Sequence, residues 1–193
     1  MTDPLTKLFG SAARVKLLRL FLFNPRATYT APDAANRARV PERTARAELA
    51  LFKSAGVIKR ARGRSAGARW GLAADFTHRA ALQGLLLNVP ERAADIVARL
   101  RGAGAVRLIV LAGMFVDEWE GRLDLLLVGD RINERKLRTR MRTIESELGK
   151  ELRYTLLSTP DFLYRYNMND KLVRDVFDYA HAVAYDRLNI GLK

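Results

Sequence analysis

Residues 111–130, LAGMFVDEWEGRLDLLLVGD, contain the arrangement in this sequence that comes closest to a catalytic site. An apolar run ends at Ala112 and Gly113, a polar loop follows, and a second apolar run carries one carboxylate, Asp124. A glycine turn beside strand carboxylates can bind phosphate groups and divalent metal ions, but a pair of such ions requires several anionic oxygens. The pattern places Asp124 alone on a strand, so the chemistry that these residues could perform is incomplete.

The order of strand, glycine, loop and strand resembles the minimal nucleotidyltransferase fold. Asp124 lies eleven residues beyond Gly113, a spacing that fits this resemblance. In that family a Gly-Ser turn contacts the nucleotide triphosphate, and an Asp-x-Asp pair and a third strand carboxylate hold two metal ions. Here Met114 stands at the serine position and Arg122 at the first aspartate position. Alternate residues of a strand point to the same side, so we expect Arg122 to place its cation where metal ions would bind and to pair with Asp124.

The site is therefore expected to be degenerate, with Gly113, Arg122 and Asp124 as its remnants. We expect no catalytic residue, no metal, no cofactor and no enzyme activity, because the third predicted strand offers no carboxylate. The sequence has no cysteine and only two histidines, which excludes thiolate sites and histidine clusters for metals. The alternative is an active nucleotidyltransferase in which an acid of the loop completes the site: Asp117, Glu118 or Glu120.

Three apolar runs with β character would position this site: residues 106–112, 123–128 and 152–157. A helix over 133–148 separates the last two, with an apolar stripe at Leu137, Met141, Ile144 and Leu148. Alternating strands and helices indicate an α/β domain with a small mixed sheet over residues 104–193. A tail helix over 166–188, capped by Asn169, is expected to close this domain.

The positive charge of the chain is concentrated in its first half. Residues 1–84 hold 16 Lys/Arg against 5 Asp/Glu, a net charge of +11, whereas residues 85–193 hold 18 against 16, a net charge of +2. This asymmetry is typical of one module that faces a polyanion and a second that does not. The apolar stretch over 15–23 is too short and too charged to span a membrane, and no cleavage-like segment follows it. We therefore expect a cytoplasmic protein without a membrane partner.

The basic half contains three short predicted helices. Ser11 can cap the first, which stops at Asn24-Pro25, and Thr30 can cap the second. The third begins at Pro41, and Gly56 is placed to end it in a left-handed conformation.

The third helix has one apolar face and one face of arginines and small residues. The apolar face is formed by Ala45, Leu49 and Phe52, and the opposite face by Arg43, Arg46, Ala47 and Ala50. Arginine can donate two hydrogen bonds to a guanine edge in the major groove of DNA, and alanines allow close approach. An ordinary amphipathic helix with a solvated charged face is the alternative interpretation of this helix taken alone.

Two short β-runs over 57–60 and 68–72 follow, and they enclose a tip of glycine and arginine that suits phosphates or the minor groove. We expect Trp70 to anchor this hairpin in the core. Three helices and a basic hairpin in this order resemble the winged helix-turn-helix of prokaryotic transcription regulators, over residues 5–74. The resemblance implies that the third helix, its approach and the hairpin carry the DNA-binding residues: Arg39, Arg43, Thr44, Arg46, Ala47, Lys59, Arg60, Arg62, Arg64 and Arg69.

We expect a helical linker over 75–103 between the two domains. A winged helix, a degenerate nucleotidyltransferase-like domain and a closing helix together resemble a group of prokaryotic transcriptional regulators. The resemblance implies double-stranded DNA as a partner and a second domain that either mediates dimerisation or senses a small-molecule or nucleotide effector. We expect a homodimer. An RNA-binding or replication-associated winged-helix protein is a further alternative. Its support is thin, because unstacked bases need aromatic platforms and aromatic residues make up 8% of the chain.

Overall fold

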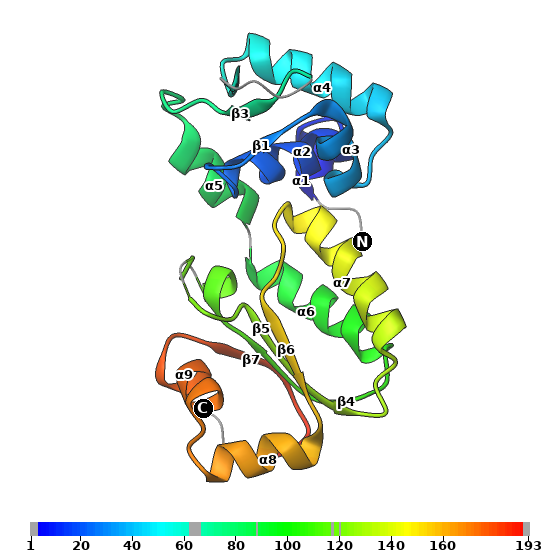
Figure 1. Ribbon diagram of the computed structural model, residues 1–193, viewed down its shortest axis with the longest axis vertical. Coiled ribbons are helices and arrows are strands. Elements are labelled where there is room, and N and C mark those ends of the chain that lie inside the picture. The colour runs from blue at the N-terminus through cyan, green and yellow to red at the C-terminus, as the bar shows by residue number, and fades with distance from the viewer. Residues whose placement is uncertain (1–3, 62–66, 88, 117, 120, 191–193) are drawn as a thin grey trace. The chain divides into compact units, whose positions relative to one another are not determined.

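The computed structural model describes residues 4–61, 67–87, 89–116, 118–119 and 121–190 (Figure 1). In this part of the chain the structure is mixed α/β with two sheets, as the sequence predicts at this level. Contacts divide the chain into two compact units. The first comprises residues 1–88 and 144–151, and the second comprises residues 89–143 and 152–193.

The helices of the first unit begin at residues that cap them. They are α1 (Pro4–Leu8), α2 (Ala12–Leu22), α3 (Ala31–Ala38), α4 (Glu42–Ser54) and α5 (Arg79–Leu87). The Ser11 hydroxyl accepts a hydrogen bond from the Arg14 N–H at the start of α2, and Thr30 and Asp33 form a capping box at the start of α3. Gly56 follows α4 at a φ of 72°, a left-handed conformation that glycine adopts without strain. The three predicted helices are thus confirmed.

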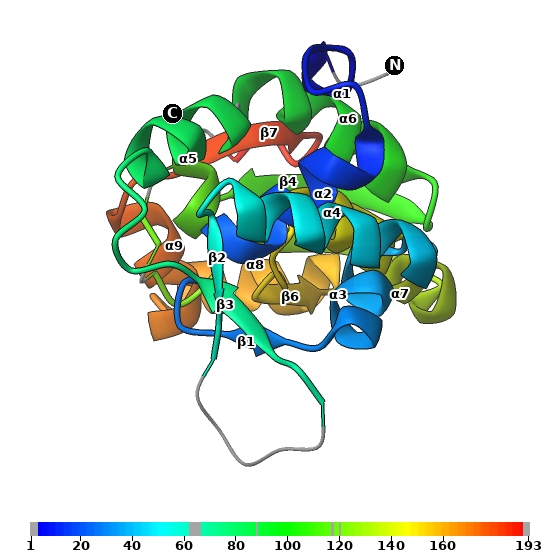
Figure 2. The ribbon, with the colours of Figure 1, turned by 90° about the horizontal axis from the view of Figure 1, so that it is seen from above.

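A small antiparallel sheet lies beside these helices. Its strands are β1 (Thr28–Tyr29), β2 (Ile58–Arg60) and β3 (Trp70–Leu72), in the order β1-β3-β2 (Figure 2). The predicted hairpin is therefore present as β2 and β3, each shorter than expected. The sequence analysis did not identify β1, whose two residues are too few to show a periodic pattern.

Residues 144–151 pack into the first unit although they are distant from the rest of it in sequence. The Arg19 side chain is 2% exposed and donates hydrogen bonds to the carbonyl oxygens of Leu86 and Glu147. Gly149 adopts a φ of 74°, and its carbonyl accepts a hydrogen bond from the Asn24 side chain. A buried arginine needs such acceptors, so the first unit is incomplete without this late segment.

The second unit contains a four-stranded mixed sheet in the order β6-β5-β4-β7. Its elements are α6 (Val89–Arg101), β4 (Ala105–Leu111), the 3-10 helix η1 (Gly113–Val116), β5 (Leu125–Asp130), α7 (Glu134–Leu148, whose last turn belongs to the first unit), β6 (Tyr154–Leu157), α8 (Thr159–Asn167), α9 (Lys171–Asp178) and β7 (Ala182–Asp186). β5 and β6 run parallel and are joined through α7, whereas β4 pairs antiparallel with both of its neighbours. The predicted stripe of α7 is buried at all four positions.

Helices cover both faces of this sheet (Figure 1). On one face α8 and α9 contribute to a core formed by Leu108, Val110, Leu126, Val128, Leu157, Phe162, Val173 and Val176. The alternate residues of β4 and β5 are also buried, and α6 packs against β4 and β7. Strands with two covered faces are continuous apolar runs, as LIVL and LLLV are.

The predicted tail helix over 166–188 is wrong. This stretch instead forms the end of α8, the short helix α9 and the strand β7. Asn169, expected as the cap, adopts a φ of 52° between the two helices, and Asp170 caps α9 through the Leu172 N–H. β7 then pairs with β4, so tertiary pairing overrides a local pattern that also suited a helix.

The expected linker over 75–103 divides between the two units. α5 packs against α2 in the first unit, and α6 packs against β4 and β7 in the second. Both helices contribute buried side chains, Leu86 from α5 and Ile96 and Leu100 from α6. Each of these helices therefore belongs to one of the compact units.

We predict that Gly149→Ala destabilises the protein more than Gly56→Ala does. Both glycines have a φ near 70°, but a Cβ at Gly149 would lie 2.5 Å from the backbone at Arg19 and Leu20, whereas Gly56 has open space. The free energy of unfolding should fall by about 1–2 kcal/mol for Gly56→Ala, from backbone strain alone. For Gly149→Ala the added overlap should bring the loss to about 2–5 kcal/mol. Urea unfolding measures both, and equal losses would contradict the packing described for residues 144–151.

Candidate functional site

Asp124 lies directly before β5, and its carboxylate is completely buried. Oδ1 accepts hydrogen bonds from the Met114 N–H at 3.0 Å and from Arg153 Nη2 at 2.8 Å. Oδ2 accepts from the Arg153 main-chain N–H and from Arg153 Nε, each at 2.9 Å. These four bonds fill the roughly four acceptor positions of a carboxylate.

The Arg153 guanidinium connects Asp124 with the loop after η1. Besides its two bonds to the carboxylate, Nη1 donates to the carbonyl oxygen of Gly121, and Nη2 lies 3.4 Å from that of Trp119. A planar guanidinium that meets a carboxylate through two nitrogens holds it in a fixed geometry. One side chain therefore fastens the start of β5 and the loop before it.

Gly113 allows the loop to approach Asp124. It adopts a φ of 52°, and a Cβ there would lie 2.4 Å from Asp124 Oδ1 and 2.6 Å from the Leu123 carbonyl oxygen. No side chain larger than hydrogen fits this position unless the loop moves. Gly113 thus lets the chain pass close to the Asp124 carboxylate, and the Met114 N–H donates a hydrogen bond to it.

The environment of Asp124 favours its charged form. Burial raises the pKa of the carboxyl, but the hydrogen bonds from the Arg153 side chain and from the main-chain N–H groups of Met114 and Arg153, with the positive charge of Arg153, outweigh it and lower the pKa below its usual value. The same pairing raises the pKa of Arg153. Asp124 is therefore an ionised acceptor, whereas a general acid would need a raised pKa.

The expected ion pair between Arg122 and Asp124 is wrong. The Arg122 side chain is 76% exposed and reaches Asp175 of α9, at 3.5 Å. β5 begins at Leu125, so Arg122 lies in the loop, where strand alternation does not apply. The partner of Asp124 is Arg153, and this pairing depends on the contact between the chain segments at the starts of β5 and β6.

Among the residues that the structure describes, no group of three or more Asp, Glu, His or Cys side chains is placed to hold a metal ion. Of the loop acids that could complete a catalytic site, Glu118 is described, and Asp117 and Glu120 lie outside the described residues. A metal ion bound to Asp124 would have to displace the Arg153 guanidinium from its carboxylate oxygens. As described, the arrangement can orient a loop and hold a pocket beside it.

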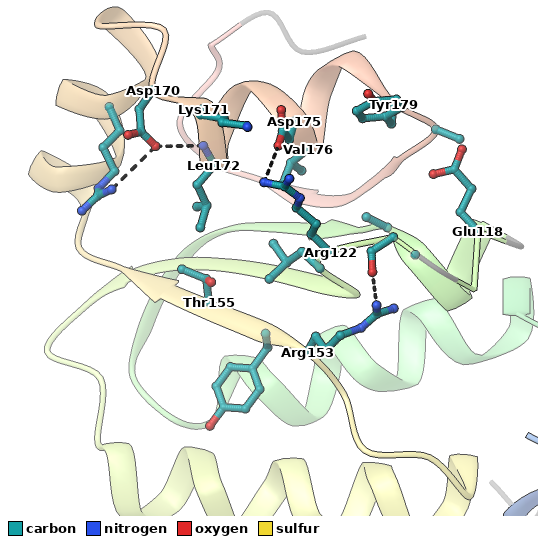
Figure 3. Close-up of a pocket in the computed structure, with 17 residues that line it drawn as sticks. Glu118, Arg122, Arg153, Thr155, Asp170, Lys171, Leu172, Asp175, Val176 and Tyr179 are labelled. Atoms are coloured by element: carbon teal, nitrogen blue, oxygen red, sulfur yellow. Dashed lines mark hydrogen bonds and ion pairs between the residues drawn. The ribbon is translucent and has the colours of Figure 1, made fainter. Parts of the chain in front are cut away.

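A pocket of about 880 Å³ adjoins this ion pair in the second unit (Figure 3). It is lined by the beginning of β6, by the helix α9, by Arg165 of α8 and by these loop residues: Ala112, Gly113, Glu118, Gly121, Arg122 and Leu123. Arg122 and Arg153 reach it from the loop and strand side, and Lys171 and Asp175 from α9 (Figure 3). Gly113 and Arg122 match the residues that the sequence predicts here. The α9 residues are not predicted, because their local pattern also suits one longer helix.

The exposed face of α4 has the composition expected of a DNA-reading helix. Arg43, Arg46 and Ala47 are exposed, and Thr44 is half-buried, while Ala45, Leu49 and Phe52 are buried. Arg46 is 64% exposed and pairs with Glu42, with Nη2 2.5 Å from Oε1. An exposed pair of this kind costs little to break, so Arg46 can exchange Glu42 for another acceptor.

Further predicted DNA contacts lie around the turn before α4 and on β2. Arg39 is exposed at the end of α3, with a φ of 51°. Arg60 is exposed, and Lys59 is exposed and pairs with Asp75 at 2.6 Å. Arg62 and Arg64 at the hairpin tip lie outside the described residues.

Arg69 has a structural role that the sequence analysis did not foresee. Its guanidinium donates to the hydroxyl and the carbonyl oxygen of Thr28 and lies 3.5 Å from Asp33. It therefore holds β1 to the start of β3, which leaves Arg69 less free to contact DNA than Arg60. Trp70 is half-buried on β3, with the Lys53 ammonium 5.8 Å from its ring, so the expected core anchor is only partly enclosed.

In comparisons with protein-family models, curated proteins and solved structures, nothing matches this chain. Among the described residues, no helix is both long enough and apolar enough to cross a membrane. The function of the chain must therefore be inferred from its own surfaces.

We predict that Asp124→Asn destabilises the protein by about 2–4 kcal/mol at pH 7, because Arg153 loses its ionic partner. The expected loss is smaller than for a fully buried ion pair, because the Arg153 side chain is 39% exposed and water can solvate it. The lowered pKa of Asp124 contributes stability that is present above its unfolded-state pKa of about 3.9 and is lost as the pH falls through the folded-state pKa. The difference between wild type and variant should therefore shrink below about pH 4.

Urea unfolding between pH 7 and pH 3 measures this difference, with Asp175→Asn as the control. Asp175 meets Arg122 at 3.5 Å in a partly exposed pair, so its loss should cost less than about 1 kcal/mol. A pH-independent difference for Asp124→Asn would contradict the assignment of Asp124 as an ionised buried acceptor.

Proposed function

We propose that this protein is a DNA-binding transcriptional regulator whose first unit reads duplex DNA through α4. The exposed face of α4, with Arg43 and Arg46 beside Ala47 and Ala50, is the observation that carries the proposal. Arginines on a helix can pair with guanine edges, and alanines between them let the helix sit deeply in the major groove. The hairpin of β2 and β3 is the wing in this proposal.

Charge supports the same assignment. Residues 1–84 carry a net charge of +11, and most of the charged side chains that pair there, such as Arg46 with Glu42 and Lys59 with Asp75, do so at the surface. Such pairs can open to phosphates, and binding then gains from the release of counterions from DNA. The near-neutral balance of residues 85–193 fits a second unit that does not contact the polyanion.

The second unit is proposed to be an inactive relative of the nucleotidyltransferases that senses a ligand or holds a dimer together. Asp124 supports this role, because Arg153 and the Met114 N–H occupy the oxygens that metal ions would need. An RNA-binding function has less support, because Trp70 is half-buried and few aromatic side chains lie near the basic surface.

We predict that Arg43→Ala and Arg46→Ala each weaken binding at the preferred DNA site by roughly 1–3 kcal/mol, if the side chain reads a base. Arg62→Ala and Arg64→Ala should weaken binding to all sequences alike and lower the salt slope by about one for each phosphate that the variant no longer neutralises. Selection from a random duplex library, followed by fluorescence anisotropy at several salt concentrations, measures both effects.

Arg138→Ala is the matched control for Arg46→Ala. Arg138 is 63% exposed on α7 and lies 3.9 Å from Glu134, four residues earlier, as Arg46 pairs with Glu42 on α4. Both variants remove one charge, but only Arg46→Ala should change the sequence preference. If the two variants change affinity and sequence preference equally, the assignment of α4 as the reading helix is wrong.

We also predict a homodimer, because a single winged helix offers a small contact surface and two linked heads gain affinity. The apolar residues of α9 do not offer the interface, because Val173 and Val176 are buried in the core of their own unit. Tyr164 and Met168 are large, exposed and four residues apart at the end of α8, which suits a self-interface better. Light scattering should give the mass of two chains for wild type and of one chain for a Tyr164→Glu/Met168→Glu variant. A monomeric wild type, with and without DNA, would contradict this.

Finally, we predict that the protein does not transfer a nucleotidyl group. The test is incubation with labelled nucleoside triphosphates, Mg²⁺ or Mn²⁺, and RNA, DNA or protein acceptors. Incorporation above background that disappears in Glu118→Gln would show that a loop acid completes a working metal site after all.

A further inference from the structure

The pocket beside the Asp124–Arg153 pair has the size and composition of a small-molecule site. Its volume of about 880 Å³ falls within the range of roughly 300–1,000 Å³ that is usual for such sites. It lies wholly in the second unit, so it is defined without reference to the first.

The wall of the pocket is held in place before any ligand arrives. Arg153 fastens the loop through the carbonyl oxygen of Gly121 and through Asp124, and Gly113 allows the close approach. A preformed wall spares a ligand the cost of ordering the loop. Arg153 uses its donors for this task, so it shapes the pocket and leaves ligand contact to other cations.

Arg165 is also engaged. Its Nε donates to Asp161 at 3.0 Å, its Nη1 lies 3.6 Å from Asp170, and these carboxylates raise its pKa. Two of the four cations that line the pocket are thus neutralised by close partners.

Arg122 and Lys171 are the cations that remain accessible. Arg122 is 76% exposed and lies 3.5 Å from Asp175, beyond an ideal hydrogen bond. Lys171 is exposed and has no ion-pair partner among the residues that the structure describes. Figure 3 shows the Arg122 side chain extending from the loop toward α9 and Lys171 at the start of that helix, with the Thr155 side chain on the strand below. Glu118 lies at the far rim, so it does not separate the two cations (Figure 3).

Apolar side chains complete the lining. Leu123 lies next to Arg122, and Leu172 and Val176 come from α9. Leu172 is 38% exposed, so part of its apolar surface is open to the pocket. A ligand with an apolar body would bury this surface and leave its charged end near Arg122 and Lys171.

We propose that this pocket binds a small organic anion, a carboxylate or a phosphate ester with an apolar body, through Arg122 and Lys171. The regulatory meaning of this site rests on the proposed function, because the ligand would then be the effector of a DNA-binding protein. The binding itself does not, since it is measured without DNA.

The test uses calorimetric titrations of the full chain with three ligands that share a naphthalene body and differ in the polar group: 1-naphthoate, 1-naphthyl phosphate and 1-naphthamide. At least one anion should bind tenfold or more tightly than the neutral amide, and the tighter anion identifies the ligand class. Arg122→Gln and Lys171→Gln should each weaken that anion about fivefold or more, while Arg138→Gln on α7 should leave it unchanged. Inorganic phosphate should bind far more weakly, because it cannot contact Leu123, Leu172 or Val176.

Several outcomes would overturn the proposal. One is that the protein binds none of the three naphthyl ligands, or binds the amide as tightly as both anions. Another is that Arg122→Gln and Lys171→Gln both bind the anion as tightly as wild type does. A third is that inorganic phosphate binds as tightly as the naphthyl anions. Thermal unfolding of the variants without ligand confirms that they are folded, since both side chains are exposed. If the protein binds the anion but not DNA, the pocket assignment holds and the proposed regulator function is wrong. If it binds DNA but none of the anions, the proposed function holds and the pocket assignment is wrong.

Discussion

The pairing of the buried Asp124 carboxylate with the Arg153 guanidinium is the interaction on which the loop and the pocket of the second unit depend. An ionised carboxylate removed from water must be compensated by charge and hydrogen bonds. Arg153 supplies both and uses its remaining donors on loop carbonyl oxygens. A residue pattern that resembles a metal-binding corner is thereby used to fix a loop. The arginine occupies the electrostatic role that cations fill in an active site.

The first unit uses a buried arginine in a similar manner. Arg19 donates to carbonyl oxygens near the ends of α5 and α7, where helix carbonyls lack intrahelical partners. Residues 144–151 therefore contribute to the unit that carries α4, although they follow it at a long distance along the chain. The proposed reading surface lies within residues 5–74, whereas the compact unit also includes residues 75–88 and 144–151.

Local signals predicted the elements that local interactions determine. Caps at Ser11 and Thr30, the glycine at 56 and the apolar stripe of α7 each depend on residues within a few positions of one another, and all four are present. The features that were missed depend on contacts between distant residues. β7 exists because it pairs with β4, and Arg153 reaches Asp124 because the Asp124 N–H donates to the Arg153 carbonyl oxygen where β5 and β6 meet. Neither pairing leaves a periodic trace in the sequence.

The central claim is that α4 lies in the groove of bound DNA, and the absence of cysteine allows a direct measurement. Ala47→Cys places a unique thiol on the exposed face of α4, and an iron–EDTA group attached there cleaves any DNA backbone close to it. On a selected duplex the account predicts a compact set of cuts at one place in the site, absent with the cysteine-free protein and different from the cuts made from Thr139→Cys on α7. Binding without cleavage from position 47, or cuts spread evenly along the duplex, would contradict it.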